Sequence, residues 1–337
     1  MAKPWKKIDG DVLGSTNAAI SDAGGTEDHA TWIRKDGRAA RFIAWADEQM
    51  AAEAAQQEVE RVSIMDSGCT GEYANERAKG PYRTYPAGWQ PKSALDRAAI
   101  LKQHFRGLDF SHVEALVERY YVSDSSGEHV GGYRDAAKGT RKILLPGDMD
   151  SGLIVFPKLE YVAALVKKQP TGWKPINLAM GYLLDVLKEA FPNFYDYTER
   201  RIGPEYEKLL GVTERALLAL GAKTPGDILV LPAQTGALFA GYSVRSSRGH
   251  MSALTRHVPL HDFGGGCFAL TDPERFTNEA LWMDCPGTER APRAGGDFCG
   301  APCWRFDDGG LGFSSSGLDD PSGLFGSASG FFPECHP

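Results

Sequence analysis

Apolar residues recur at helical spacing in several parts of this chain and alternate with polar, glycine-rich stretches. The clearest case is residues 38–62, where Phe42, Trp45 and Met50 fall on one face of a helix. Ser93 is a residue type that caps helices, and an apolar pattern follows it. Similar spacing predicts helices over residues 93–105, 111–121, 157–168, 177–191 and 204–220.

Short apolar runs bounded by turn residues predict the strands. They lie at residues 143–145, 153–156, 227–231, 266–270, 281–285, 302–306 and 311–313. A capping-box pattern at residues 271–274 predicts one short helix between two of them. After Gly236, glycine, serine, proline and aromatic residues dominate. We therefore expect an α+β fold, with a helix-rich N-terminal and central part and a short-stranded, β-rich C-terminal part.

The same pattern suggests three divisions of the chain. Residues 1–36 are polar without sustained periodicity, which is typical of a flexible arm. Residues 37–240 form a mixed helical domain with central short strands. Residues 241–337 form a β-rich, Gly/Ser-rich region that either belongs to the same domain or makes its own lobe.

Composition narrows the class of protein. The chain has 337 residues, of which 42% are hydrophobic and 24% charged, as in globular proteins. No apolar run approaches the ~18 residues that cross a bilayer, and no secretory pattern is present, so we expect a cytoplasmic protein with reduced thiols and no membrane partner. The net charge of −7 makes nucleic acid an unfavoured partner.

A turn with two carboxylates follows the apolar run at residues 143–145. Asp148 and Asp150 are separated by one residue, and Ser151 follows them. Two carboxylates near one point suit a hard cation such as Mg²⁺. The alternative is a solvated turn, because the same residues have ideal turn chemistry.

Asp-Ser-Gly occurs twice, at Asp66 and Asp150, and each time an apolar residue lies nearby. This resembles the active-site turn of aspartic proteases, in which two carboxyl groups share a proton. Those enzymes are nearly all β, whereas both turns here lie beside helix-rich sequence. We therefore interpret the repeat as a coincidence between two turns.

Five of the six cysteines lie in the last quarter of the chain. Cys299 and Cys303 have a chelating spacing, and Cys285 or the Cys335-His336 pair completes a tetrahedral zinc set. The alternative is that these cysteines are ordinary core residues.

Two further segments have polar groups suited to a ligand. Residues 243–261 carry Arg245, Arg248 and Arg256, which suit an anion, although a solvated basic loop is the favoured interpretation. Gln234 and Thr235 follow the strand at 227–231, where α/β proteins often bind polar ligands.

Two classes of function follow. Glycine fingerprints for nucleotides, a serine-hydrolase elbow and a His-Glu-x-x-His motif are absent from the sequence. We expect a non-enzymatic binding or structural assembly protein, a homo-oligomer or a subunit bound to other proteins, such as a component of a viral or phage particle. The alternative is a metal-assisted transferase or hydrolase centred on Asp148 and Asp150. The first is favoured because no catalytic constellation is complete.

Overall fold

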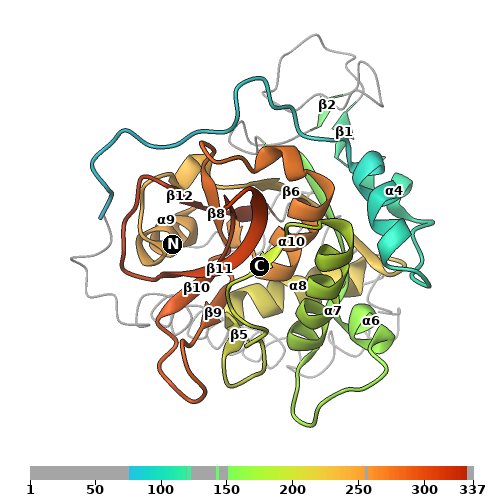
Figure 1. Ribbon diagram of the computed structural model, residues 1–337. Coiled ribbons are helices and arrows are strands. Elements are labelled where there is room, and N and C mark those ends of the chain that lie inside the picture. The colour runs from blue at the N-terminus through green and yellow to red at the C-terminus, as the bar shows by residue number, and fades with distance from the viewer. Residues whose placement is uncertain (1–75, 119, 123–141, 144–150, 255–256, 332–337) are drawn as a thin grey trace, which may run out of the picture. The chain divides into compact units, whose positions relative to one another are not determined.

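The computed structural model describes residues 76–118, 120–122, 142–143, 151–254 and 257–331 (Figure 1). These residues form helices and several β-sheets, so the predicted mixture of α and β structure is confirmed. The arm at residues 1–36, the helix expected at residues 38–62 and the turn with Asp148 and Asp150 lie outside the described residues.

Seven α-helices and two sheets of more than two strands organise the described residues. The α-helices are α4 (Ala94–His104), α5 (Val113–Glu118), α6 (Leu159–Leu165), α7 (Pro175–Ala190), α8 (Gly211–Lys223), α9 (Val244–Ala253) and α10 (Asp262–Thr271), with short 3₁₀ helices η3 (Ala237–Phe239) and η4 (Pro273–Arg275). The strands are β1 (Tyr121–Val122), β2 (Lys142–Ile143), β3 (Leu153–Pro157), β4 (Tyr195–Asp196), β5 (Glu207–Leu209), β6 (Ile228–Gln234), β7 (His257–Pro259), β8 (Trp282–Asp284), β9 (Thr288–Arg290), β10 (Gly300–Asp307), β11 (Gly310–Gly317), β12 (Phe325–Ser327) and β13 (Ser329–Phe331).

Strands distant in sequence pair in both larger sheets. One sheet has the order β3-β6-β13-β7, and β3 and β6 are antiparallel with every residue buried. The other contains β12-β8-β10-β11-β4, with β9 joining β10 to β5. Both sheets therefore combine strands from either side of residue 240, and β1 and β2 form a separate pair.

Local signals specify several elements correctly. Ser93 caps α4, because its Oγ accepts a hydrogen bond from the Asp96 backbone N–H. Pro175 opens α7, whose apolar side packs in the core beside α6 and α10. Asp308 and Gly309 both have positive φ and form the two-residue turn that joins β10 to β11.

Helix α10 corrects the sequence prediction, which placed a strand at residues 266–270. Every residue of α10 is buried, and the helix contacts β3, β10, α4 and α7, so no amphipathic period appears (Figure 1). A Cβ at Gly266 would lie 2.5 Å from both Leu183 and Trp304. The glycines therefore allow close packing in the helix. His261 caps it, since its Nδ1 accepts from the Gly264 backbone N–H.

Two other predictions are wrong in their boundaries. Residues 244–253 form the helix α9, not a solvated basic loop. Helix α8 begins at Gly211 instead of Pro204, because residues 207–209 pair with β9 as β5. In both places a tertiary partner, absent from the local pattern, decides the structure.

Candidate ligand-binding site

The described cysteines are not gathered at one metal centre. Cys285 and Cys303 are buried, and Cys299 is exposed. Among the described residues, no group of three or more His, Cys, Asp or Glu side chains is placed to hold a metal ion. Burial also raises the pKa of the Cys285 and Cys303 thiols, which disfavours the thiolate that zinc requires.

The arginines expected to bind an anion are engaged within the protein. Arg245 lies in α9 and forms an ion pair with Asp319. Arg248 is buried, and its guanidinium donates to Glu289 Oε1 at 2.9 Å and to the Pro286 carbonyl at 2.9 Å. Arg256 lies outside the described residues. These arginines hold α9 against its neighbours.

Gln234 and Thr235 join strands at the end of β6. Both are fully buried. The Gln234 amide donates to the Ser327 carbonyl at 2.8 Å, and its oxygen accepts from the Gly236 backbone N–H at 2.7 Å. The Thr235 hydroxyl lies 2.8 Å from Ser151 Oγ. These bonds connect β6 to the last strands and to the start of β3.

A buried polar centre with perturbed carboxyl groups lies between β5, β9 and α10. Burial and the neighbouring Asp262 raise the pKa of Glu207 well above its usual value, and burial also raises the pKa of Asp262. Arg290 Nη1 lies 3.4 Å from Glu207 Oε2, and Thr288 Oγ1 donates to Asp262 at 2.9 Å. These carboxyl groups line neither of the two cavities described below, so we assign them to the structure of the core.

A cavity of about 500 Å³ lies where β3, α6, α7, β5 and α8 meet. Its wall is mainly apolar and includes Phe156, Ile176, Leu209, Leu217 and Leu229. The volume lies in the range of sites that bind small molecules, which are typically apolar with a few placed polar groups. We call this space the apolar cavity.

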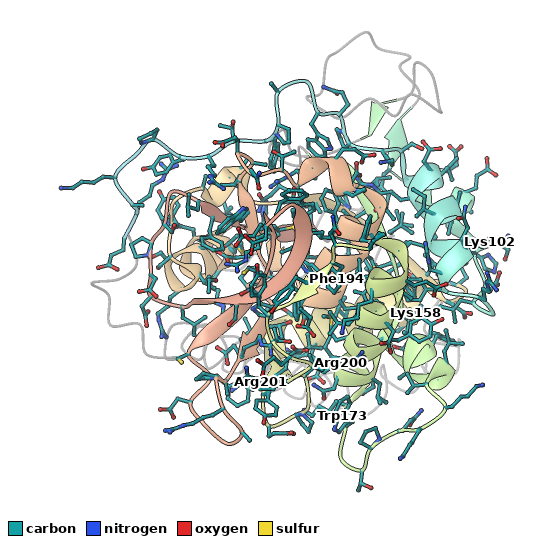
Figure 2. The ribbon with its side chains drawn as sticks, in the orientation of Figure 1. Lys102, Lys158, Trp173, Phe194, Arg200 and Arg201 are labelled. Atoms are coloured by element: carbon teal, nitrogen blue, oxygen red, sulfur yellow. The ribbon has the colours of Figure 1, made fainter. Side chains whose placement is uncertain are left out.

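Lys158 is the buried charged group in the wall of the apolar cavity (Figure 2). The residue is 7% exposed. Its Nζ donates to the Gly221 carbonyl at 3.0 Å and to the Thr224 carbonyl at 2.8 Å, at the C-terminal end of α8. A cation there is stabilised by the helix dipole and bonds to carbonyl groups at the helix end, of which that of Gly221 also accepts from the Thr224 backbone N–H.

One donor of this ammonium group remains for a ligand. An ammonium carries three N–H donors, and the two carbonyls use two of them. Within the described part of the chain, the third has no hydrogen-bond acceptor. The Tyr161 ring lies 5.6 Å from Nζ and adds a cation–π contact. The arrangement suits an anionic or carbonyl oxygen at one end of an apolar ligand.

The rim of the apolar cavity exposes apolar surface. Leu218 is 64% exposed and Tyr161 is 40% exposed, and both line the cavity. Glu160, Lys174 and Glu214 supply the charged part of the rim. Large apolar side chains held in water beside a concave apolar surface are typical of a binding site.

The sequence pattern did not reveal this site. Lys158 follows the strand at 153–156, but its two acceptors lie more than sixty positions later in the chain. The one local signal is in α8, where Leu217, Leu218 and Leu220 place apolar side chains on more than one face. That pattern indicates a second apolar contact for α8 beyond the core.

Comparison with known proteins assigns no relative: no family model matches the chain, and neither the curated proteins nor the solved structures give a match. Among the described helices, none has the length and apolar character needed to span a bilayer.

Proposed function

We propose that this chain is a non-enzymatic binding protein, and that its ligand is a small amphipathic acid whose hydrocarbon part fills the apolar cavity. The ligand carboxylate accepts the remaining N–H of Lys158. The observation that carries this proposal is a buried ammonium group in the wall of a mainly apolar cavity whose other charged side chains are exposed at the rim.

The energetics of the cavity favour a ligand with a hydrocarbon part and a carboxylate at one end. Each methylene group removed from water contributes about 0.8 kcal/mol, so affinity rises roughly fourfold per added methylene until the cavity is full. A charge-assisted hydrogen bond to Lys158 selects the acid over an alcohol of the same length. An amine of that length is disfavoured because two cations would meet in a poorly hydrated site.

The lining supports binding over catalysis. Among the described residues that line the apolar cavity, none is His, Cys, Ser or Thr, so a serine, threonine or cysteine nucleophile with a histidine base is missing there. Particle assembly, and a metal-assisted reaction at Asp148 and Asp150, stay predictions that the described residues do not address.

Calorimetric titration with decanoate, decanol and decylamine tests the proposal. We expect decanoate to bind most tightly and Ala222→Trp to abolish binding, because residue 222 is exposed and lines the cavity. Ala219→Trp is the matched control, since Ala219 is an exposed residue of the same helix outside the lining. Equal loss of binding in both variants, or no binding by the wild type, would refute the proposal.

A further inference from the structure

A second cavity of about 500 Å³ is lined by the connection between α6 and α7, by α7 itself and by residues 200 and 202. Its lining differs from that of the apolar cavity, because it gathers charged and aromatic groups. Lys167, Lys168 and Arg200 provide three positive charges, and Asp185 provides one negative charge. Trp173 and Tyr182 add aromatic walls. We call this space the basic cavity.

Arg200 is held in an uncommon backbone conformation. Glu199 and Arg200 have φ values of 53° and 61°, a left-handed region that residues other than glycine seldom adopt. The Asp196 carboxylate stabilises this turn by accepting from the Thr198 backbone N–H at 2.9 Å and the Arg200 backbone N–H at 3.0 Å. Strained backbone of this kind is concentrated at functional sites, where it fixes the direction of a side chain.

The Arg200 guanidinium is anchored but retains donors. Its Nη1 donates to Asp185 Oδ1 at 2.5 Å, and its Nη2 donates to the Gly181 carbonyl at 3.0 Å. The Arg200 side chain is 40% exposed, so solvent or a ligand reaches it. A guanidinium has five N–H donors, so three remain after these two bonds. A fixed planar group with spare donors suits bidentate binding of phosphate.

The two lysines add charge that the protein does not neutralise. Lys167 and Lys168 follow the end of α6 and are exposed. Neither forms an ion pair or a hydrogen bond with another described residue. The side chains that line the cavity carry three positive charges and one negative charge, a sum of about +2, in a chain whose net charge is −7. The Asp196 carboxylate, which lies outside the lining, also acts on Arg200. A phosphate monoester carries about −1.5 to −2 at pH 7, which matches the charge of the lining side chains.

A tight turn places Trp173 beside these cations. The Trp173 backbone N–H donates to the Pro170 carbonyl at 3.2 Å, and Gly172 adopts a φ of +83° in the third position of the turn. Trp173 is half-buried, and Figure 2 shows it near Arg200. An indole face is a platform for a planar ring, and such stacking contributes about 1–3 kcal/mol for a nucleobase.

We infer that the basic cavity binds a small molecule in which a phosphate monoester is joined to a planar ring, such as a nucleoside 5′-monophosphate. Arg200 and the two lysines contact the phosphate, and Trp173 stacks on the ring. The volume lies in the range of small-molecule sites. The inference is independent of the proposed function, because the two cavities share no lining residue.

Calorimetric titration of the full chain with adenosine 5′-monophosphate, adenosine and inorganic phosphate tests this inference. We expect the monophosphate to bind at least tenfold more tightly than either part alone. Arg200→Gln lowers its affinity about 10- to 100-fold, since a charge-assisted bidentate contact is lost. Arg201→Gln is the matched control, because Arg201 donates to the Thr198 and Pro292 carbonyls and does not line the cavity.

Further variants separate binding from folding. Lys167→Gln with Lys168→Gln leaves the fold intact, because both side chains are exposed, and weakens monophosphate binding with a smaller salt dependence. Trp173→Leu lowers affinity for the monophosphate and not for inorganic phosphate. Equal affinities for the monophosphate and phosphate, or equal losses in Arg200→Gln and Arg201→Gln, overturn the inference. Because the two cavities share no lining residue, we expect saturating decanoate to leave the affinity for the monophosphate unchanged. The monophosphate and decanoate titrations therefore test the two cavities separately, and a negative result in one does not decide the other.

Discussion

The charged groups inside the core and those in the cavity walls differ in what lies beside them, which is protein alone for the first and a cavity for the second. Arg97 is fully buried, and its guanidinium donates to the Leu153 carbonyl at 3.0 Å, to the Ser151 carbonyl at 3.2 Å and to Asp272 at 2.5 Å. Its Nε has no hydrogen-bond partner among the described residues, but the whole side chain is enclosed by protein. Lys158 and Arg200, by contrast, lie in the walls of cavities and retain donors that a ligand can reach. The first kind of group holds elements together, and the second kind also presents a donor to a cavity.

Substitutions at the two kinds of charged group are therefore expected to affect different properties, the stability of the fold in one case and ligand binding in the other. Removing a buried charge leaves its partner unpaired in a medium of low polarity, so the fold loses several kcal/mol. Removing a cavity charge costs less stability, because among the described residues it leaves no buried charged partner behind at Lys158 and only a solvent-exposed one at Arg200, but it changes which ligands bind. Substitutions of the two kinds therefore have opposite profiles in unfolding and binding experiments.

The largest effect is expected at Arg97. Arg97→Leu removes the guanidinium that pairs with Asp272 and lies over the Phe268 ring. It leaves the buried carboxylate with the more distant Lys92 ammonium, at 3.9 Å, as its remaining cation among the described residues, so we expect a loss of about 3–5 kcal/mol in the free energy of unfolding. Denaturant unfolding measures this loss. The double variant with Asp272→Asn removes the buried carboxylate charge and recovers part of the stability. Recovery of nothing in the double variant would show that packing, not charge, dominates at this position.

A pH-dependent effect is expected at Asp284. Burial raises its pKa to about 7, although the Ser316 hydroxyl and the Arg248 charge oppose that shift. The protonated form is thus favoured in the folded state. Its contribution to stability is fully present below about pH 4 and is lost as the pH rises towards 7, by on the order of 3–4 kcal/mol.

Asp284→Asn tests whether the contribution of Asp284 to stability falls as the pH rises. The amide keeps a polar partner for Ser316 but does not titrate, so the difference in unfolding free energy between the wild type and the variant changes between pH 4 and 7 and is constant below pH 4. Thermal or denaturant unfolding across this range gives the difference curve. A wild type that gains stability relative to the variant as the pH rises would contradict the assignment.

Lys158 has features of both kinds of charged group, because it is buried and bonded to the end of α8 and also lines the apolar cavity. Lys158→Met removes two hydrogen bonds to the end of α8 and costs about 2 kcal/mol, because the apolar stem is retained. The variant also loses the preference for decanoate over decanol in the apolar cavity. Calorimetry at fixed ionic strength checks the preference, and unfolding checks the stability. An unchanged preference would remove Lys158 from the ligand site.

Sequence alone predicted the elements whose signals are local. The buried run at 153–156 and the apolar helix at 177–191 agree with β3 and α7 within a few residues. Helix α10 was not predicted, because its glycines suit close packing against Trp304, which lies nearly forty positions later in the chain. The helical conformation is decided there by packing on all sides, which leaves no amphipathic period to detect.

The sites were harder to predict than the fold for the same reason. Lys158 belongs to a site only because the carbonyls at the end of α8 lie beside it, and Arg200 only because Asp196 stabilises a left-handed turn. Residue types such as Asp-x-Asp or Cys-x-x-x-Cys attract attention in a sequence, whereas a lysine and an arginine in ordinary surroundings do not. Their chemistry arises from tertiary contacts.

The smallest effect on stability is expected at the rim of the apolar cavity. Leu218 is 64% exposed, so Leu218→Ser changes the free energy of unfolding by no more than about 0.5 kcal/mol. Its side chain covers a ligand that enters the cavity, so decanoate affinity falls several-fold as apolar contact is lost. Leu254→Ser, at an exposed leucine outside the lining, leaves that affinity unchanged. If both variants bind decanoate as the wild type does, Leu218 does not contact the ligand. The surface that binds decanoate would then lie inside the cavity and exclude the rim.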